Sequence, residues 1–85
     1  MAYRIELAVS AKKTLDKLPQ DIRRRIAAAI DSLSQTPRPP GTIQLTGAVG
    51  LYRIRVGSYR IVYCIQDERL LVLVVKIDHR REVYC

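Results

Sequence analysis

Three arginines stand close together in residues 51–64, which read LYRIRVGSYRIVYC. They are Arg53, Arg55 and Arg60, and the stretch contains no acidic residue. Like charges that face one another across a sheet destabilise it by up to about 1 kcal/mol. Because the guanidinium fork matches a phosphate group, such a cluster is typical of an anion site, and phosphate is the ligand that fits best. The alternative interpretation is that the arginines only keep an exposed sheet face soluble.

The same stretch alternates between apolar and polar residues like a half-buried β-hairpin. Gly57 occupies the first position of a two-residue turn, which is typical of a type II′ turn. Pairing the residues that flank the turn and counting outward places Arg55 opposite Arg60, and Arg53 opposite Val62. The tyrosines and isoleucines then point to the other face, which we expect the helices to cover.

A second group of candidate residues ends the chain, in DHRREVY at 78–84: His79, Arg80, Arg81 and Tyr84. A two-residue turn before the last strand would bring His79 to the arginine face, whereas one extra residue would bring Arg80 there. The sequence leaves both arrangements open. A solvated histidine at a strand end, and a tyrosine that covers the sheet edge, are the alternatives to functional roles for His79 and Tyr84.

Length and composition limit the class of protein. The chain has 85 residues, 48% of them hydrophobic, which predicts one domain over residues 1–85. Its net charge of +7 favours a polyanionic partner, such as nucleic acid, anionic lipid or an acidic protein. No apolar run is long enough to span a membrane, and MAYRIELAVSAKK carries charges where a signal peptide is apolar. We therefore expect a cytoplasmic protein without a membrane partner.

Cysteine and histidine are too few for a metal or disulfide framework. Cys64 falls inside an expected strand and Cys85 is the last residue, and His79 is the only histidine. A structural zinc site needs four ligands of these types. We expect no metal and no cofactor.

The remaining pattern predicts the elements that position the arginines. Residues 2–9 alternate like a strand, Ser10 is placed to cap a helix that runs to about Leu18, and Pro19 suits the first turn of a second helix. Residues 36–50 read as a proline- and glycine-rich loop, and three strands follow at 51–56, 59–66 and 70–77. The order β-α-α-β-β-β predicts an α+β domain with a helical hairpin packed on one face of a largely antiparallel four-stranded sheet.

The hairpin, the HRREVY ending and the opening AYRIELAVSAKKTLDKLP together resemble the RelE branch of the RelE/ParE toxin superfamily of toxin–antitoxin modules. The resemblance extends from Ala2 to Tyr84 and implies the RelE-like fold. It implies a type II toxin that enters the ribosomal A site and cuts messenger RNA there. The implied partners are the ribosome, the message and a cognate antitoxin, with operator DNA bound only through the antitoxin complex.

The resemblance also implies roles for the arginines of the hairpin. Arg53 and Arg55 match two basic positions that are lysines in the best-known member, and Arg60 matches an arginine that holds the scissile phosphate. Cutting RNA without a metal requires a base for the 2′-proton, an acid for the leaving oxygen and cations for the dianionic phosphorane. Arginine is a poor base, so all three residues are best interpreted as phosphate clamps and RNA-binding residues.

Proton transfer falls to the C-terminal group. Arg80 matches an arginine implicated in protonating the leaving group, and Tyr84 matches a tyrosine that stacks on the message or orients the nucleophile. His79 stands where the best-known member has lysine, and it is the only conventional proton-transfer residue here. Arg81 adds a further RNA-binding charge.

Two other functions share this fold. A ParE-like gyrase inhibitor is equally basic but acts by binding, and fold alone does not separate it from the nuclease. The third possibility is a toxin-derived binding module without activity, because two lysines of the best-known member are arginines here and the chain ends one residue after Tyr84.

Overall fold

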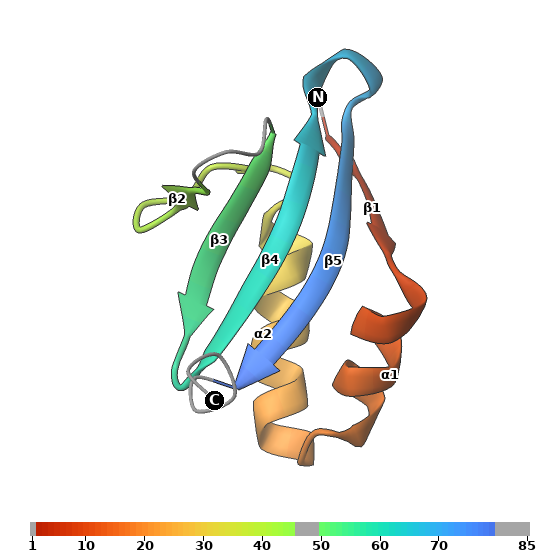
Figure 1. The fold of residues 1–85 in the computed structure, drawn as a ribbon, viewed down its shortest axis with the longest axis vertical. Helices are drawn as coiled ribbons and strands as arrows, with labels where there is room; N and C mark the ends of the chain where they lie inside the picture. Colours follow the sequence, from red (N-terminus) through yellow and green to blue (C-terminus); the bar gives the residue numbers. More distant parts are fainter. Residues whose placement is uncertain (1, 46–49, 80–85) are drawn as a thin grey trace.

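The computed structural model describes residues 2–45 and 50–79, which form a mixed sheet with two helices on one of its faces (Figure 1). The elements in chain order are β1 (Arg4–Leu7), α1 (Val9–Lys17), α2 (Gln20–Ser32), β2 (Ile43–Gln44), β3 (Leu51–Val56), β4 (Tyr59–Gln66), the 3-10 turn η1 (Asp67–Arg69) and β5 (Leu71–His79). The α+β class and the packing of the helical hairpin on one face are confirmed. None of the helices in the described part is long and apolar enough to cross a membrane.

The described residues form a sheet of five strands in the order β1-β5-β4-β3-β2, where four were expected. β1 pairs with β5 in parallel, and the other three pairings are antiparallel. The additional strand is the two-residue β2, which lies in the segment expected to be only a loop. Ile43 pairs with Arg53 and Gln44 with Tyr52, because the backbone groups along the outer edge of β3 need partners.

The β3–β4 hairpin has the register expected from its turn. Val56 pairs with Tyr59, and Arg55 faces Arg60. Gly57 has a φ of +59°, the left-handed region that the first position of a type II′ turn requires. The turn therefore fixes which side chains of the hairpin share a face.

The first helix begins differently from the expectation that Ser10 caps it. α1 starts at Val9, after an extended Ala8 that makes no side-chain cap. The Ser10 hydroxyl donates to the carbonyl oxygen of Val75 in β5, at 3.4 Å. Ser10 therefore links the helix to the sheet. Pro19, expected in the first turn of the second helix, lies one residue earlier, at the N-cap of α2.

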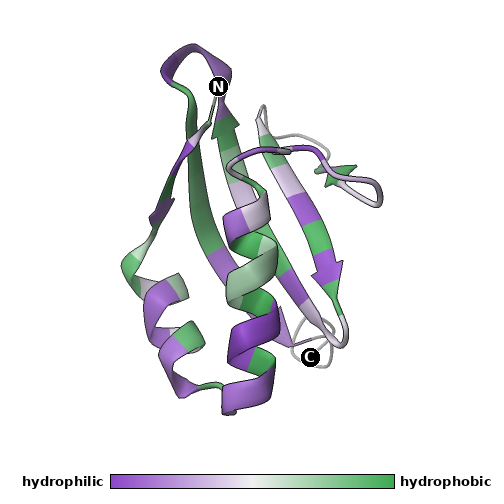
Figure 2. Cartoon of the chain, turned by 180° about the vertical axis from the view of Figure 1, so that it is seen from behind, coloured by the Kyte–Doolittle hydropathy of each residue, from purple (hydrophilic) through white to green (hydrophobic). Residues whose placement is uncertain are grey.

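The core lies between the helices and the covered face of the sheet. Ile26, Ile30 and Leu33 form the buried stripe of α2 and its end, at the three- and four-residue spacing typical of one helix face. They pack with residues of β4 such as Ile61 and Tyr63, both fully buried. Figure 2 shows the helices in front and β5 hydrophobic over most of its length. Within residues 2–45 and 50–79, no helix covers the opposite face of the sheet (Figure 1).

Candidate functional site

The three hairpin arginines lie on the open face of the sheet, where their alternation with the core residues places them. Arg55 directly faces Arg60, and Arg53 faces Val62. Arg55 is exposed and Arg53 is half-buried, whereas Arg60 is only 6% exposed. The exposed part of this cationic cluster is therefore on β3, and the Arg55–Arg60 pair lies next to the residues that border the turn.

Arg60 is less isolated than the sequence indicated. We expected the protein to leave all three arginines without an acidic neighbour, but β5 places Asp78 directly opposite Arg60. The Asp78 side chain is 16% exposed, and its carboxylate lies 3.2 Å from the Nζ of Lys76. The expectation was wrong at this position because it considered β3 and β4 alone. Arg60 stands between a cation on β3 and an anion on β5.

The rest of the open face has charges of both signs. Towards its other edge, Nε of Arg4 lies 3.0 Å from a carboxylate oxygen of Glu6 on β1. The face is thus predominantly cationic only over β3 and β4, which defines the arginine cluster (Arg53, Arg55 and Arg60) as the candidate anion site.

His79 lies on the other face of the sheet. Tyr63 pairs with Val74 and Val62 with Lys76, so Val75 is an extra residue that has no opposite number on β4. This bulge changes which face each side chain beyond it points to. The sequence left open an extra residue in the turn before the last strand, whereas the structure has four residues between Gln66 and Leu71 and places the extra residue inside β5. His79 consequently pairs with Tyr59.

The His79 ring meets the Tyr59 ring edge to face, with centroids 4.9 Å apart and an interplanar angle of 81°. Tyr59 packs against the core, so this contact belongs to the helix-covered face. The structure therefore separates His79 from the side chains of the arginine cluster. Three other expected site residues, Arg80, Arg81 and Tyr84, lie outside the described residues.

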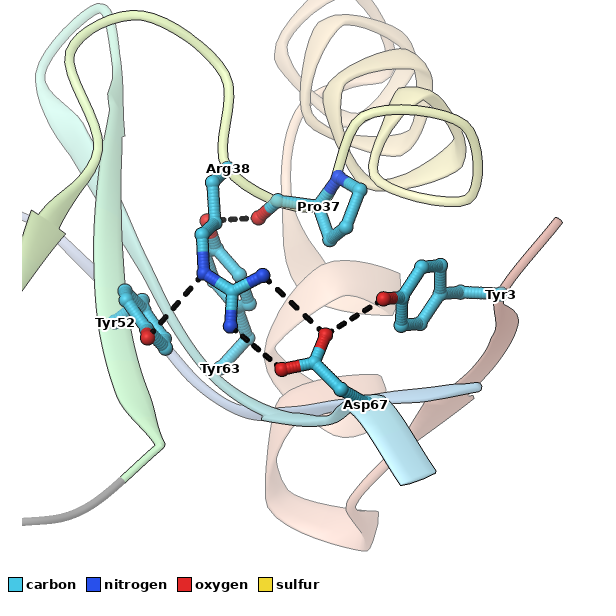
Figure 3. Close-up of polar contacts among 6 residues, drawn as sticks. All are labelled: Tyr3, Pro37, Arg38, Tyr52, Tyr63 and Asp67. Carbon is cyan, nitrogen blue, oxygen red and sulfur yellow. Dashed lines mark hydrogen bonds and ion pairs between the residues drawn. The ribbon is translucent and has the colours of Figure 1, made fainter. Parts of the chain in front are cut away.

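Sequence reasoning missed a polar cluster at the opposite end of the sheet, centred on Arg38 and Asp67 (Figure 3). The two terminal nitrogens of Arg38 donate to the two carboxylate oxygens of Asp67, at 3.3 and 2.8 Å. Nε of Arg38 donates to the Tyr52 hydroxyl at 3.3 Å, and the Tyr3 hydroxyl donates to Asp67 at 2.6 Å. The cluster ties the 36–42 loop to Tyr3 just before β1, to β3 and to η1.

This polar cluster shifts the protonation of its members. The hydrogen bonds from Arg38 and then Tyr3 hold the pKa of Asp67 below its usual value. The hydrogen bond to Asp67 raises the pKa of Tyr3 and that of Arg38 in turn. The only sequence signal was an arginine inside the proline-rich TPRPPG segment, and its partner is distant in the chain.

The 36–42 loop is also anchored by Tyr63 of β4, whose side chain is fully buried. Its hydroxyl donates to the carbonyl oxygen of Pro37 at 2.8 Å, and burial raises the pKa of this phenol. Thr42 lies 3.5 Å from the same hydroxyl. This end of the sheet is thus built for rigidity, whereas the exposed cations lie nearer the turn.

Metal-binding side chains do not converge in residues 2–45 and 50–79. No group of three or more His, Cys, Asp or Glu side chains is arranged there to hold a metal ion. The chemistry that this geometry offers is the binding of an anion by guanidinium groups on the open face of a rigid sheet.

Comparison with known proteins identifies the family of this chain. Residues 5–84 match the family described as the ParE toxin of the type II toxin–antitoxin system, parDE. The chain is 32% identical to Toxin RelG of Mycobacterium tuberculosis, over 99% of this chain and 98% of that protein. It is 31% identical to the mRNA interferase toxin RelE of Escherichia coli, over 99% of this chain and 92% of the relative.

Solved structures give the same result. The archaeal RelE–RelB complex from Pyrococcus horikoshii contains a chain that superimposes with a TM-score of 0.84 at 30% identity, covering 94% of this chain and 97% of that one. The isolated Escherichia coli RelE toxin gives 0.81 at 29% identity, covering 98% and 92%. With its helical hairpin on one face of the sheet and its match to the toxin family over nearly its whole length, this chain belongs to the ParE toxin family of type II toxin–antitoxin systems and is a RelE-like toxin.

Proposed function

We propose that this toxin is a ribosome-dependent endoribonuclease that cuts messenger RNA in the ribosomal A site. The observation that carries the proposal is the arginine cluster, in which Arg55 and Arg60 directly face each other on the open face of the sheet and Arg53 lies beside them. A relative of 31% identity is named an mRNA interferase toxin. Inhibition of translation then follows from loss of the message.

The reaction proposed is attack by a 2′-hydroxyl oxygen on the adjacent phosphorus. The new oxygen–phosphorus bond forms as the bond to the 5′-oxygen breaks, leaving a 2′,3′-cyclic phosphate and a 5′-hydroxyl. Negative charge grows on the phosphorane oxygens, and Arg53, Arg55 and Arg60 stabilise it. Because Arg60 is buried and flanked by Asp78, its guanidinium is held in place before the substrate arrives.

Proton transfer in this proposal belongs to the C-terminal residues. Arg80 is proposed as the donor to the leaving oxygen, Tyr84 as the residue that orients the message, and Arg81 as an additional RNA contact. The proton of the attacking 2′-hydroxyl passes to solvent water. His79 lies on the helix-covered face, so its position does not support a role in proton transfer beside Arg60. The ribosome supplies the in-line arrangement of the message, and orientation of this kind lowers a barrier by roughly 7 to 11 kcal/mol.

Primer extension on translating ribosomes tests the proposal. Arg55→Ala removes an exposed cation from the cluster, so the fold should be retained while cleavage falls more than about tenfold. Arg4→Ala is the matched control, because Arg4 is an exposed arginine at the other edge of the same face. Equal cleavage by the parent and Arg55→Ala proteins would contradict the assignment.

A gyrase inhibitor is the second candidate, because the matching family is described by its ParE members. Accumulation of gyrase cleavage complexes, together with intact messages on ribosomes, would establish this function. Codon-phased cuts without gyrase complexes would establish the nuclease. A protein that does neither would be a binding module derived from the toxin.

We further propose that a cognate antitoxin binds this toxin in the cytoplasm, and that operator DNA is bound only through that complex. Related toxins have been solved as RelE–RelB complexes, from Pyrococcus horikoshii and Escherichia coli among others. A net charge of +7 favours an acidic partner segment, but charge alone gives salt-sensitive binding. Apolar burial should make the pair survive about 0.5 M salt, whereas binding to ribosomes should not survive it. Dissociation of both at the same salt concentration would refute apolar burial.

A further inference from the structure

A pocket of about 250 Å³ lies on the helix-covered side of the β3–β4 turn, behind the arginine cluster. Its polar lining comes from Arg25 of α2, Ser58 of the turn and His79 of β5, and the rest is Ile22, Val56, Gly57 and Tyr59. Guanidinium, imidazole and hydroxyl groups can all donate hydrogen bonds, and none of these lining residues has a carboxylate. The polar groups of the pocket therefore favour an anionic ligand.

Arg25 is positioned over the turn at close range. A β-carbon built on Gly57 would lie 3.5 Å from Nη2 and 3.7 Å from Nη1 of Arg25. The absence of a side chain at Gly57 therefore leaves room beside the guanidinium. His79 is oriented by its edge-to-face contact with the Tyr59 ring, so two donors from different elements converge on one space.

The pocket and the arginine cluster share one end of the hairpin. Arg55 and Arg60 flank the residues that border the turn, and their side chains lie on the open face. Arg25 and His79 approach the same turn from the helix-covered face. A chain of phosphate groups that passes around the hairpin end would meet donors on both faces.

We propose that this pocket binds an RNA phosphate next to the one held by the arginine cluster. The proposal rests on the proposed function for the identity of the ligand as RNA. It assigns Arg25, Ser58 and His79 as binding residues outside the reacting centre. Their contribution is to affinity and to the placement of the message, because they touch a phosphate that does not react.

The only histidine of the chain makes the test direct, because the imidazole of His79 gives a single set of ring signals in NMR. Inorganic phosphate and a short single-stranded RNA are titrated separately into the purified protein. Both should shift the ring signals saturably, and Arg25→Ala should weaken both titrations about tenfold, as expected for the loss of one charge-assisted contact. Ser58→Ala should weaken them by a smaller factor.

Arg24→Ala is the matched control. Arg24 is the exposed neighbour of Arg25 in α2, carries the same charge and does not line the pocket. Equal weakening by Arg24→Ala and Arg25→Ala would show general attraction by a basic helix and would overturn the site. Ring signals that do not move would also overturn it, and a response to phosphate but not to RNA would overturn the assignment to RNA.

Two further experiments distinguish failure of the proposed cleavage from failure of the pocket. A parent protein that leaves messages intact on ribosomes, but whose His79 signals respond to RNA in an Arg25-dependent way, would refute the proposed cleavage and support the pocket. A parent protein that cuts messages, and whose Arg25→Ala form cuts them with an unchanged KM and unmoved ring signals, would refute the pocket and support the nuclease.

Discussion

Two substitutions of Arg60 can distinguish the contribution of its side chain to stability from its proposed binding of the scissile phosphate. The side chain is 6% exposed, so truncation to alanine removes a buried methylene stem worth about 2 kcal/mol at about 0.8 kcal/mol for each CH₂. Loss of the charge returns at most about 1 kcal/mol by relieving the repulsion with Arg55, and it costs up to about 1 kcal/mol because Asp78 loses the cation opposite it on β4. The net expectation is that Arg60→Ala lowers the free energy of unfolding by about 1 to 2 kcal/mol, a drop in Tm of roughly 5 to 15 °C.

Arg60→Met keeps most of the apolar stem and removes the charge. Its free energy of unfolding should stay within about 1 kcal/mol of the parent, as measured by urea denaturation. Both variants should lose more than about tenfold in ribosomal cleavage, since each lacks one charge-assisted contact to the phosphorane. Cleavage by Arg60→Met at the parent rate would refute the phosphate role, and an Arg60→Ala protein as stable as the parent would refute the packing role.

Three further outcomes are expected. The pKa of Asp67 is lowered in the folded state, so the stability from its contact with Arg38 is present at neutral pH and is lost on acidification. Between about pH 5 and pH 2, the Tm of the parent should therefore fall more than that of Asp67→Asn in thermal denaturation. An equal fall in both proteins would contradict this. Tyr63→Phe should cost about 1 kcal/mol in urea denaturation, because a buried hydrogen bond to a loop carbonyl is lost, and no change would mean that water replaces it. Arg80→Ala and Tyr84→Phe should reduce cleavage far more than ribosome binding, since their proposed contacts form in the transition state; equal losses would mark them as docking residues.

Much of the fold follows from local patterns. The apolar stripe of α2, the turn residue Gly57 and the alternation of β3 and β4 each act over a few residues, so their consequences are readable in order along the chain. They were enough to place Arg55 opposite Arg60. The fifth strand was missed because two residues form it only by using the open edge of β3.

The candidate site was predicted less completely, because burial and charge compensation come from elements that are distant in the chain. Asp78 reaches Arg60 only through the β4–β5 pairing, which the hairpin sequence does not contain. Arg38 and Asp67 are likewise brought together by the path of a loop across the sheet end. Neither pairing has a periodicity that sequence reasoning can detect.

The amino-acid sequence by itself determined that three arginines share one face of a hairpin, because side chains alternate strictly along a strand and the turn fixes the register. Only the tertiary structure determined that the His79 side chain lies on the helix-covered face of the sheet. One additional residue, Val75, bulges from β5 directly after Val74, the last residue that pairs with β1, and it reverses which face each later side chain of β5 points to. The carbonyl oxygen of Val75 accepts a hydrogen bond from the Ser10 hydroxyl of α1, so the bulge belongs to tertiary packing that no local pattern specifies.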